Sequence, residues 1–275
     1  MDRLFVVNKP PFISSAKYAN QIKRKYNFKN IGFSGTLDPF ATGALIVATG
    51  KFTKLFQYLK KTPKVYQATM WLGVESKSID LENIISINKT KELKIEDIKK
   101  TLNTLLGKIE YLPPIYSAKK INGKRAYELA REDKEVELKK IKSTIYDIKL
   151  INYNHPFLTF EASVSEGAYI RSIALLIAKK LKTKATLSAL KRVKEGEFRF
   201  ENEKFLNPYE HLKIKKNIYL GDFKTLELGK KLSIKDFKIQ KDGIYLVESK
   251  NYNAIIEIDK EKVKYKINNL PKEWR

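Results

Sequence analysis

One segment of the chain, residues 32–43, combines residue types that can do chemistry. It reads GFSGTLDPFATG, with three glycines and a single carboxylate, Asp38. Glycine permits positive φ and lets the backbone approach a ligand closely. Pro39 disfavours the helical conformation at Asp38, so we expect the carboxylate on a shaped loop. A carboxylate held in this way can act as a nucleophile or as a general base.

The charge around Asp38 makes this carboxylate informative. Residues 3–74 contain 12 Lys or Arg side chains, and Asp38 is the one acidic residue among them. A protein that only grips phosphates gains nothing from a carboxylate there, because it repels the ligand, whereas one that acts covalently on a nucleotide needs such a group. Two other interpretations stay open from the residue types. Asp38 can bond its own backbone in an Asx turn, or the glycines can cradle a phosphate, although neither GxGxxG nor GxxxxGK[ST] occurs.

The composition narrows the class of protein. The 275 residues are 43% hydrophobic, enough for a core, and carry a formal net charge of +24. There is no cysteine and there are only two histidines, which excludes disulfides, thiolate nucleophiles and cysteine-based metal sites and argues against a histidine-rich one. The N-terminus lacks an apolar signal core, and no run approaches 18 apolar residues, so we expect a cytoplasmic protein without a membrane span.

The position of the basic charge matters more than its amount. Of the 55 cations 47 are Lys, a skew that an A+T-rich genome produces by itself. Residues 217–275, by contrast with residues 3–74, hold 13 cations and 9 acids. A cationic field concentrated in one part of the chain predicts a nucleic-acid face there, and a solvated surface is the alternative.

The elements that must position Asp38 can be read from periodicity and end signals. We expect strands at residues 4–7, 44–48, 64–72, 144–152 and 157–164, and helices at 14–26, 51–60, 95–106 and 168–181. Short strand-like runs follow at 243–248, 254–258 and 263–267. Strand and helix do not alternate regularly, which favours an α+β fold. The predicted division is a main domain at residues 1–215 and a small β-rich appendage at 216–275.

Six blocks in order along the chain resemble motifs of the TruB family of tRNA pseudouridine 55 synthases. They are Asn8-Lys9-Pro10 with Ser14-Ser15; Gly35-Thr36-Leu37-Asp38-Pro39 with Ala41-Thr42-Gly43; Lys64-Val65-Tyr66; Pro113-Pro114-Ile115-Tyr116-Ser117-Ala118 with Gly123-Lys124 and Tyr127-Glu128; Ser165-Glu166-Gly167-Ala168-Tyr169-Ile170-Arg171-Ser172; and Leu190-Lys191-Arg192. Three positions depart from the family pattern. Phe33 replaces a usual His, only Asp80 remains of an acidic stretch that reads Ser76-Lys77-Ser78-Ile79-Asp80, and Lys191 replaces Arg.

The resemblance implies the pseudouridine synthase fold, a mixed and largely antiparallel sheet flanked by helices, and a C-terminal appendage similar to a PUA RNA-binding domain. It also implies an isomerase that uses neither metal nor cofactor. The reaction breaks the N1–C1′ bond of a uridine in the TΨC loop of tRNA, at position 55, rotates the uracil and rejoins it through C5. Asp38 matches the catalytic aspartate, acting at C1′, at C6 or through a glycal.

The remaining site residues follow from the same resemblance. Arg171 matches the arginine that pairs with the aspartate, and Tyr66 the tyrosine that packs on the target base and helps to move the C5 proton. Tyr169 and Leu190 match residues that line the substrate pocket. Without the resemblance, Arg171 reads as a surface helix cation and the other three as ordinary core residues. Lys9 is expected to hold either the motif loop or a phosphate.

Phe33 is expected to stack as an apolar wedge in the RNA loop that the flipped nucleotide leaves, with core packing as the alternative. The expected partner is the TΨC stem-loop of tRNA, bound by a monomer that has no obligate protein partner and no membrane contact.

Two rival functions remain. A non-catalytic RNA-binding or tRNA-chaperone protein on the same fold would not need Asp38, Tyr66 and Arg171 together. A guide-RNA-dependent synthase of the dyskerin type shares the motifs but carries extended termini, so the short N-terminus favours a stand-alone enzyme. Glycoside hydrolysis by paired carboxylates lacks a second acid near Asp38 in the sequence.

Overall fold

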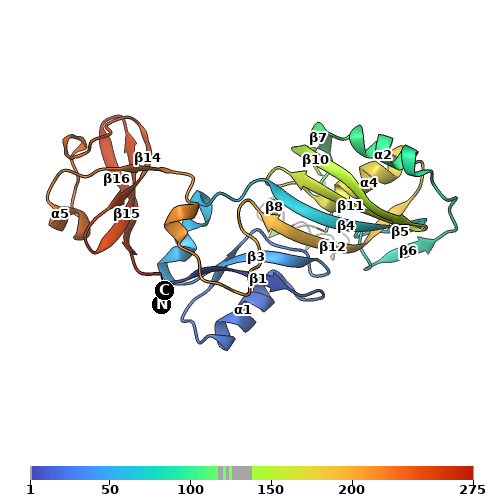
Figure 1. The fold of residues 1–275 in the computed structure, drawn as a ribbon, viewed down its shortest axis with the longest axis horizontal. Coiled ribbons are helices and arrows are strands. Elements are labelled where there is room, and N and C mark those ends of the chain that lie inside the picture. The colour runs from blue at the N-terminus through green and yellow to red at the C-terminus, as the bar shows by residue number, and fades with distance from the viewer. Residues whose placement is uncertain (1, 117–119, 122–123, 126–137, 275) are drawn as a thin grey trace.

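The computed structural model describes residues 2–116, 120–121, 124–125 and 138–274. Within these residues one large sheet and one small sheet form the body of the protein, with the small C-terminal sheet at one end (Figure 1). Part of one sequence motif lies outside the described residues, namely Ser117, Ala118, Gly123, Tyr127 and Glu128.

The main sheet is mixed and largely antiparallel, as predicted. Its described strands run in the order β1-β3-β12-β4-β11-β10-β7. Strand β2 pairs with the C-terminal part of β3. Only the β3–β12 pair is parallel. The strands are β1 (Leu4–Lys9), β2 (Gly32–Ser34), β3 (Thr42–Ala48), β4 (Lys64–Leu72), β7 (Gly107–Tyr111), β10 (Ile141–Asn154), β11 (Phe157–Val164) and β12 (Ala185–Glu195). Two small hairpins, β5 (Val74–Ser76) with β6 (Ile84–Ile87) and β8 (Lys120–Ile121) with β9 (Lys124–Arg125), lie outside this sheet.

Two helices, α2 (Ile95–Asn103) and α4 (Ile170–Lys180), cover one half of the main sheet (Figure 1). Both are amphipathic in sequence, and α4, which contacts β4 and β12, buries Ile173 and Ile177 in the core. Helix α1 (Ser15–Lys25) packs on the other half, beside β1 and β3. It begins where predicted, because the Ser14 hydroxyl accepts a hydrogen bond from the Lys17 backbone N–H (3.2 Å).

The helix predicted over residues 51–60 is instead a 3₁₀ helix, η1 (Gly50–Tyr58). Its inward residues Phe52, Leu55 and Tyr58 are spaced by three. That spacing matches the three residues per turn of a 3₁₀ helix, in which such side chains stack on one face. The predicted inward residues Leu55 and Leu59 are both buried. The remaining short helices are η2 (Pro208–His211), α5 (Phe223–Glu227) and η3 (Ile234–Asp236).

The small sheet contains the strands β13 (Lys215–Asn217), β14 (Gly243–Glu248), β15 (Tyr252–Asp259) and β16 (Lys262–Pro271), in that order. Alternation assigns its two faces to two different cores. On β15, Ala254 and Ile256 face a core inside the C-terminal unit. Ile255 faces a second core, together with Leu246 of β14.

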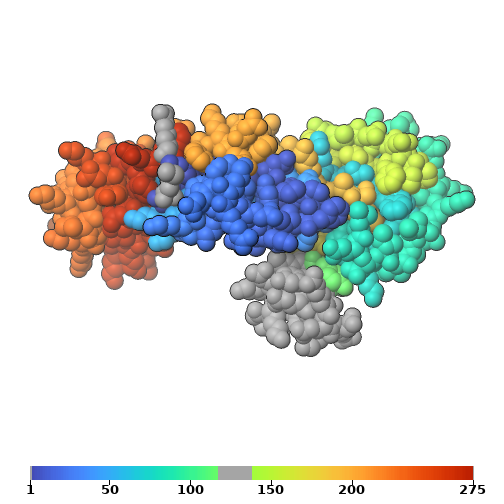
Figure 2. All heavy atoms as spheres, turned by 90° about the horizontal axis from the view of Figure 1, so that it is seen from below, coloured from blue at the N-terminus to red at the C-terminus, as the bar shows by residue number. Residues whose placement is uncertain are grey.

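This second core is shared between the two sheets. It contains Phe52 and Leu55 of η1 and Leu4 and Val6 of β1 in addition to the residues of the small sheet. The 3₁₀ helix is therefore the layer through which the C-terminal unit packs on the main sheet. In the space-filling view the N-terminal segment, coloured blue, lies between the C-terminal unit and the half of the molecule that carries α2 (Figure 2). None of the helices in the described ranges is long and apolar enough to cross a membrane.

Candidate active site

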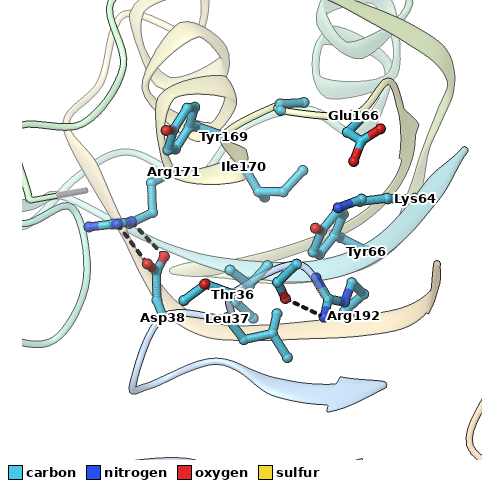
Figure 3. Close-up of a pocket in the computed structure, with 14 residues that line it drawn as sticks. Thr36, Leu37, Asp38, Lys64, Tyr66, Glu166, Tyr169, Ile170, Arg171 and Arg192 are labelled. Carbon is cyan, nitrogen blue, oxygen red and sulfur yellow. Dashed lines mark hydrogen bonds and ion pairs between the residues drawn. The ribbon is translucent and has the colours of Figure 1, made fainter. Parts of the chain in front are cut away.

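A pocket of about 300 Å³ opens where the two halves of the main sheet meet. Figure 3 shows the side chains that line it. They come from the loop after β2, from β4, from the loop before α4 together with its first turn, and from β12. Segments far apart in the sequence thus supply one wall each. Five of the seven residues that the sequence singled out are in the lining: Asp38, Tyr66, Tyr169, Arg171 and Leu190.

Asp38 and Arg171 form a two-point ion pair. Asp38 Oδ2 lies 2.9 Å from Arg171 Nε, and Arg171 Nη2 donates to Asp38 Oδ1 at 2.9 Å (Figure 3). This fork-to-fork geometry orients the carboxylate as well as stabilising its charge. The arginine is buried, while a third of the Asp38 side chain (33%) remains accessible from the pocket. One side of the carboxylate is thus bound by Arg171, and the other side is open to the pocket.

Arg171 is fixed by its own set of partners. Its Nη1 donates to the Ser78 carbonyl at 2.9 Å, and its Nη2 donates to the Tyr116 carbonyl at 2.6 Å. A second carboxylate, Asp80, places Oδ2 3.8 Å from Nη1. Asp80 is buried and accepts hydrogen bonds from the Ser78 hydroxyl and the Glu82 backbone N–H. The remnant of the acidic stretch, Ser78 to Asp80, therefore contacts the guanidinium of Arg171 and fixes its position.

The surroundings perturb the pKa of Asp38. Burial raises the pKa of this carboxyl above its ordinary value, the Arg171 guanidinium opposes that rise, and the Asp80 charge adds to it. Arg171 thus favours the ionised form of a desolvated carboxyl group. A group with a perturbed pKa in a pocket is typical of a reactive site.

The motif loop that carries Asp38 is anchored by side chains from the first 15 residues. The Ser15 hydroxyl, at the start of α1, accepts from the Leu37 backbone N–H (2.9 Å) and donates to the Leu37 carbonyl (3.1 Å). The Lys9 ammonium donates to the carbonyls of Pro10, Ile13 and Pro39 at 2.7–3.1 Å. Three acceptors use all three of its protons, so these contacts fit the first of the two roles expected for Lys9, holding the loop. Burial lowers the pKa of Lys9 to about 8, and nearby Asp38 opposes the shift.

A buried charge cluster supports the other end of the loop. Arg192 donates from Nε to the Ala44 carbonyl and from Nη2 to the Gly35 carbonyl, both at 2.8 Å. The Glu195 carboxylate lies 3.3 Å from Arg192 Nη2 and 3.2 Å from Lys64 Nζ. Gly35 has positive φ, and a Cβ there would come within 2.9 Å of Glu195, so only glycine fits above this cluster.

Tyr66 lies on β4, on the side of the pocket where Lys64 and Arg192 are found (Figure 3). Its ring is buried, and burial raises the pKa of its hydroxyl, while the guanidinium of Arg192 opposes the shift. Tyr66 and Arg192 are register partners on β4 and β12. At ordinary pH the hydroxyl is therefore protonated and can donate.

The other predicted site residues have different positions. Leu190 of β12 is buried in the wall, and Tyr169 precedes α4, where its backbone N–H donates to the Tyr111 hydroxyl (3.0 Å). Phe33 is not part of the pocket lining. It lies half-buried on β2 against the apolar cluster of Phe5, Val7 and Val47.

Sequence reasoning did not assign roles to Ser15, Lys64, Asp80 or Glu195, which complete the site. Ser15 and Lys64 lie within recognised motif blocks and Asp80 is what remains of the acidic stretch, so a signal was present for them. Glu195 had no such signal. In the described ranges no group of three or more His, Cys, Asp or Glu residues is arranged to hold a metal ion.

Comparisons with known sequences identify relatives of this chain. A profile described as TruB family pseudouridylate synthase (N terminal domain) matches residues 23–170, more than half of the chain. The chain is 60% identical over 272 residues to the tRNA pseudouridine synthase B of Sulfurovum sp. (strain NBC37-1), which covers 99% of this chain and 98% of the relative. It is 50% identical over 272 residues to the protein of that name from Campylobacter concisus (strain 13826), covering 99% and 100%.

Solved structures share the fold at low sequence identity. A Cbf5-Nop10-Gar1 complex matches with a TM-score of 0.70 and 18% identity, over 99% of this chain and 86% of that one. An archaeal box H/ACA sRNP Nop10-Cbf5 complex matches with a TM-score of 0.67 and 17% identity, over 99% and 87%. The predicted pseudouridine synthase fold is thereby confirmed. Together with the sequence matches, these findings show that the chain belongs to the TruB family of tRNA pseudouridine synthases, which are isomerases.

Proposed function

We propose that this protein converts uridine to pseudouridine at position 55 in the TΨC loop of tRNA, with Asp38 as the nucleophile and no cofactor. The observation that carries the proposal is the two-point contact between Asp38 and Arg171 in a pocket that also contains Tyr66. The contact supplies an ionised carboxylate with one open side. The nearby aromatic ring supplies a surface on which a base can stack.

The target uridine has to leave its loop to reach Asp38. Unstacking a base costs a few kcal/mol, which contacts in the pocket and along the phosphates offset. A pocket of about 300 Å³ accommodates a nucleobase with part of its ribose. Tyr66 and Leu190 line the space for the base, and Asp38 lies where the glycosidic bond would be placed. Arg171 holds the carboxylate in the ionised state that attack or proton abstraction requires.

The expected partner is the tRNA alone. Support comes from relatives named tRNA pseudouridine synthase B, which match this chain over nearly their whole length. The Cbf5 chains, which belong to complexes with other proteins, are only 17–18% identical. We therefore propose a monomer that works in the cytoplasm without an obligate protein partner, in which residues 216–275 form a PUA-like unit that adds RNA contacts.

Tritium release is the decisive assay. Formation of pseudouridine replaces the C5–H bond by a C5–C1′ bond, so tRNA made with 5-tritiated uridine releases tritium to water as product forms. The purified protein alone should release the label and place one pseudouridine at position 55. A non-catalytic RNA-binding protein would bind the same tRNA and release none. A dyskerin-type enzyme would release label only when a guide RNA and partner proteins are added.

A further inference from the structure

The two ends of the pocket carry different net charges. At one end, two cations, Arg171 and the nearby Lys9, balance two carboxylates, Asp38 and Asp80. At the other end, two cations, Lys64 and Arg192, share one carboxylate, Glu195. In Figure 3 the Lys64 side chain extends over Tyr66, on the opposite side of the pocket from Asp38 and Arg171. The site therefore has a balanced end at Asp38 and a positive end at Lys64.

Stability alone does not explain the second cation. The Glu195 and Arg192 side chains are almost completely buried, and only 9% of the Lys64 side chain is exposed. Glu195 and Arg192 already balance each other, and the Arg192 guanidinium is committed to the carbonyls of Gly35 and Ala44. A further desolvated cation is costly, since one carboxylate cannot neutralise two positive charges. Within the described chain, Glu195 is the one ionic partner of the Lys64 ammonium.

The chemistry of the reaction supplies a use for this charge. When the N1–C1′ bond breaks, its electron pair leaves with the uracil and spreads over O2 and O4. If a nucleophile adds at C6 instead, the charge develops on C5 and O4. When C5 then bonds to C1′, the charge is withdrawn, C5 loses its proton and N1 gains one, so the formula of the nucleoside is unchanged. Every route makes the base electron-rich for part of the reaction.

We propose that Lys64 is a catalytic residue that binds a carbonyl oxygen of the flipped uracil and stabilises the negative charge that develops there. The inference rests on the proposed function of this same pocket. A cation fixed in a water-poor site acts more strongly on developing charge than it would in water. The preformed contact with Glu195 holds the ammonium in place. The base then spans the pocket, with its carbonyl edge at Lys64 and its glycosidic bond at Asp38.

A backbone phosphate is the other group that a lysine can bind. The burial of Lys64 beside Tyr66 favours the base, because a phosphodiester of the flipped nucleotide stays nearer to the solvent. At the mouth of the pocket the exposed carboxylate of Glu166, whose side chain is 55% exposed, pairs instead with Lys61 (3.5 Å). The two possibilities differ in what the loss of Lys64 should change, which is the chemical step or the affinity.

The test replaces Lys64 by methionine, which fills a similar volume without charge. Lys64→Met leaves the Glu195–Arg192 pair balanced, so its melting temperature should stay close to that of the wild type. The single-turnover rate of pseudouridine formation should fall about 100-fold or more, the usual scale for losing one stabilising donor. The affinity for tRNA should be unchanged, and Lys64→Arg should recover part of the rate. Lys149→Gln removes an exposed lysine that also pairs with a glutamate, Glu161 (2.9 Å), and serves as the matched control.

A modified substrate separates electrostatic catalysis from a structural role. Fluorine at C5 withdraws electrons and stabilises the uracil anion, so tRNA with 5-fluorouridine at the target should need Lys64 less. The ratio of wild-type to Lys64→Met rates, measured as consumption of the target N-nucleoside, should be smaller for this substrate than for uridine. Any loss of folded protein cancels between the two substrates.

Three results would overturn the inference. They are a stable Lys64→Met enzyme with the wild-type rate, an equal rate ratio for the two substrates, or weakened tRNA binding with a flatter salt dependence, which would assign Lys64 to a phosphate. In each of these cases the wild-type protein still makes pseudouridine, and the proposed function stands. A wild-type protein that makes none would overturn the proposed function itself, and the inference with it.

Discussion

Asp38 and Arg171 lie 133 positions apart in the sequence and meet through two contacts of 2.9 Å each. The carboxylate comes from the loop after β2, and the guanidinium comes from the first turn of α4. The pair thus bridges the two halves of the main sheet. Its geometry makes the following predictions specific.

Asp38→Asn should abolish isomerisation and leave tRNA affinity within a few-fold of the wild type. The amide keeps the shape of the side chain and removes only the charge that the chemistry needs. Tritium release and filter binding on the same preparation check both parts. Turnover near the wild-type level would return Asp38 to a structural role in an Asx turn.

Arg171→Lys should lose most activity although it conserves charge. An ammonium cannot satisfy two carboxylate oxygens and the carbonyls of Ser78 and Tyr116 from one plane, as the guanidinium does. Single-turnover rates for this variant, with circular dichroism to confirm folding, measure the effect. A folded and fully active Arg171→Lys enzyme would contradict the importance of the planar contact.

Lys9 should make the protein more stable as the pH rises from about 8 to 10.5. Its pKa is about 8 in the folded protein against 10.5 in the unfolded chain, so the unfolded chain binds more protons in this window. The gain approaches about 3 kcal/mol at full titration. The measurement is the free energy of unfolding of the wild type minus that of Lys9→Met across this window. A difference that falls with rising pH would show that the Lys9 pKa is not lowered.

Salt dependence should locate the RNA face. Of the 12 cations in residues 3–74, Arg3, Lys9 and Lys64 are buried, so the exposed ones must neutralise the phosphates. Replacing Lys17, Arg24 and Lys29 by Gln should flatten the plot of log affinity against log salt by a little under ~1 unit for each phosphate that is no longer neutralised. The same change at Lys231, Lys235 and Lys238 in the C-terminal unit is the control and should do less. Equal effects of the two triple variants would refute the placement of the basic face.

Phe33→Ala should lower both the melting temperature and the affinity for tRNA. The half-buried ring packs on the cluster around Phe5 with one part and leaves the rest for stacking, worth about 1–3 kcal/mol per base. Phe33→His keeps a flat ring and should retain substantial activity. An affinity unchanged in Phe33→Ala, with a lower melting temperature, would leave Phe33 with a core role only.

Much of the fold follows from local patterns, and the exceptions have physical causes. The predicted limits of the strand at residues 157–164 agree with β11, because Leu158, Phe160, Ala162 and Val164 alternate cleanly. The sequence patterns did not predict the central strand β12. Its register against β4 shifts at two points, and it buries Arg192 and Glu195, so its sequence shows neither alternation nor an apolar run.

The candidate site divides in the same way. Side chains inside motifs, such as Asp38, Tyr66 and Arg171, were accessible from the sequence through family resemblance. The partners that hold Arg171 include the backbone carbonyls of Ser78 and Tyr116, which any residue type can supply. No sequence pattern predicts such a hydrogen bond, because it depends on how the fold places the backbone carbonyl.

The shared core around η1 gives the molecule a fixed length. Because Phe52 and Leu55 pack with both the main sheet and the small C-terminal sheet, the spacing between pocket and C-terminal unit is set by interlocked side chains. The two units are therefore held at a fixed separation, unlike two domains joined by a flexible linker. An RNA that touched both units at once would have to present its target nucleotide at that one separation, so we expect the packing of η1 to favour folded tRNA over other RNAs.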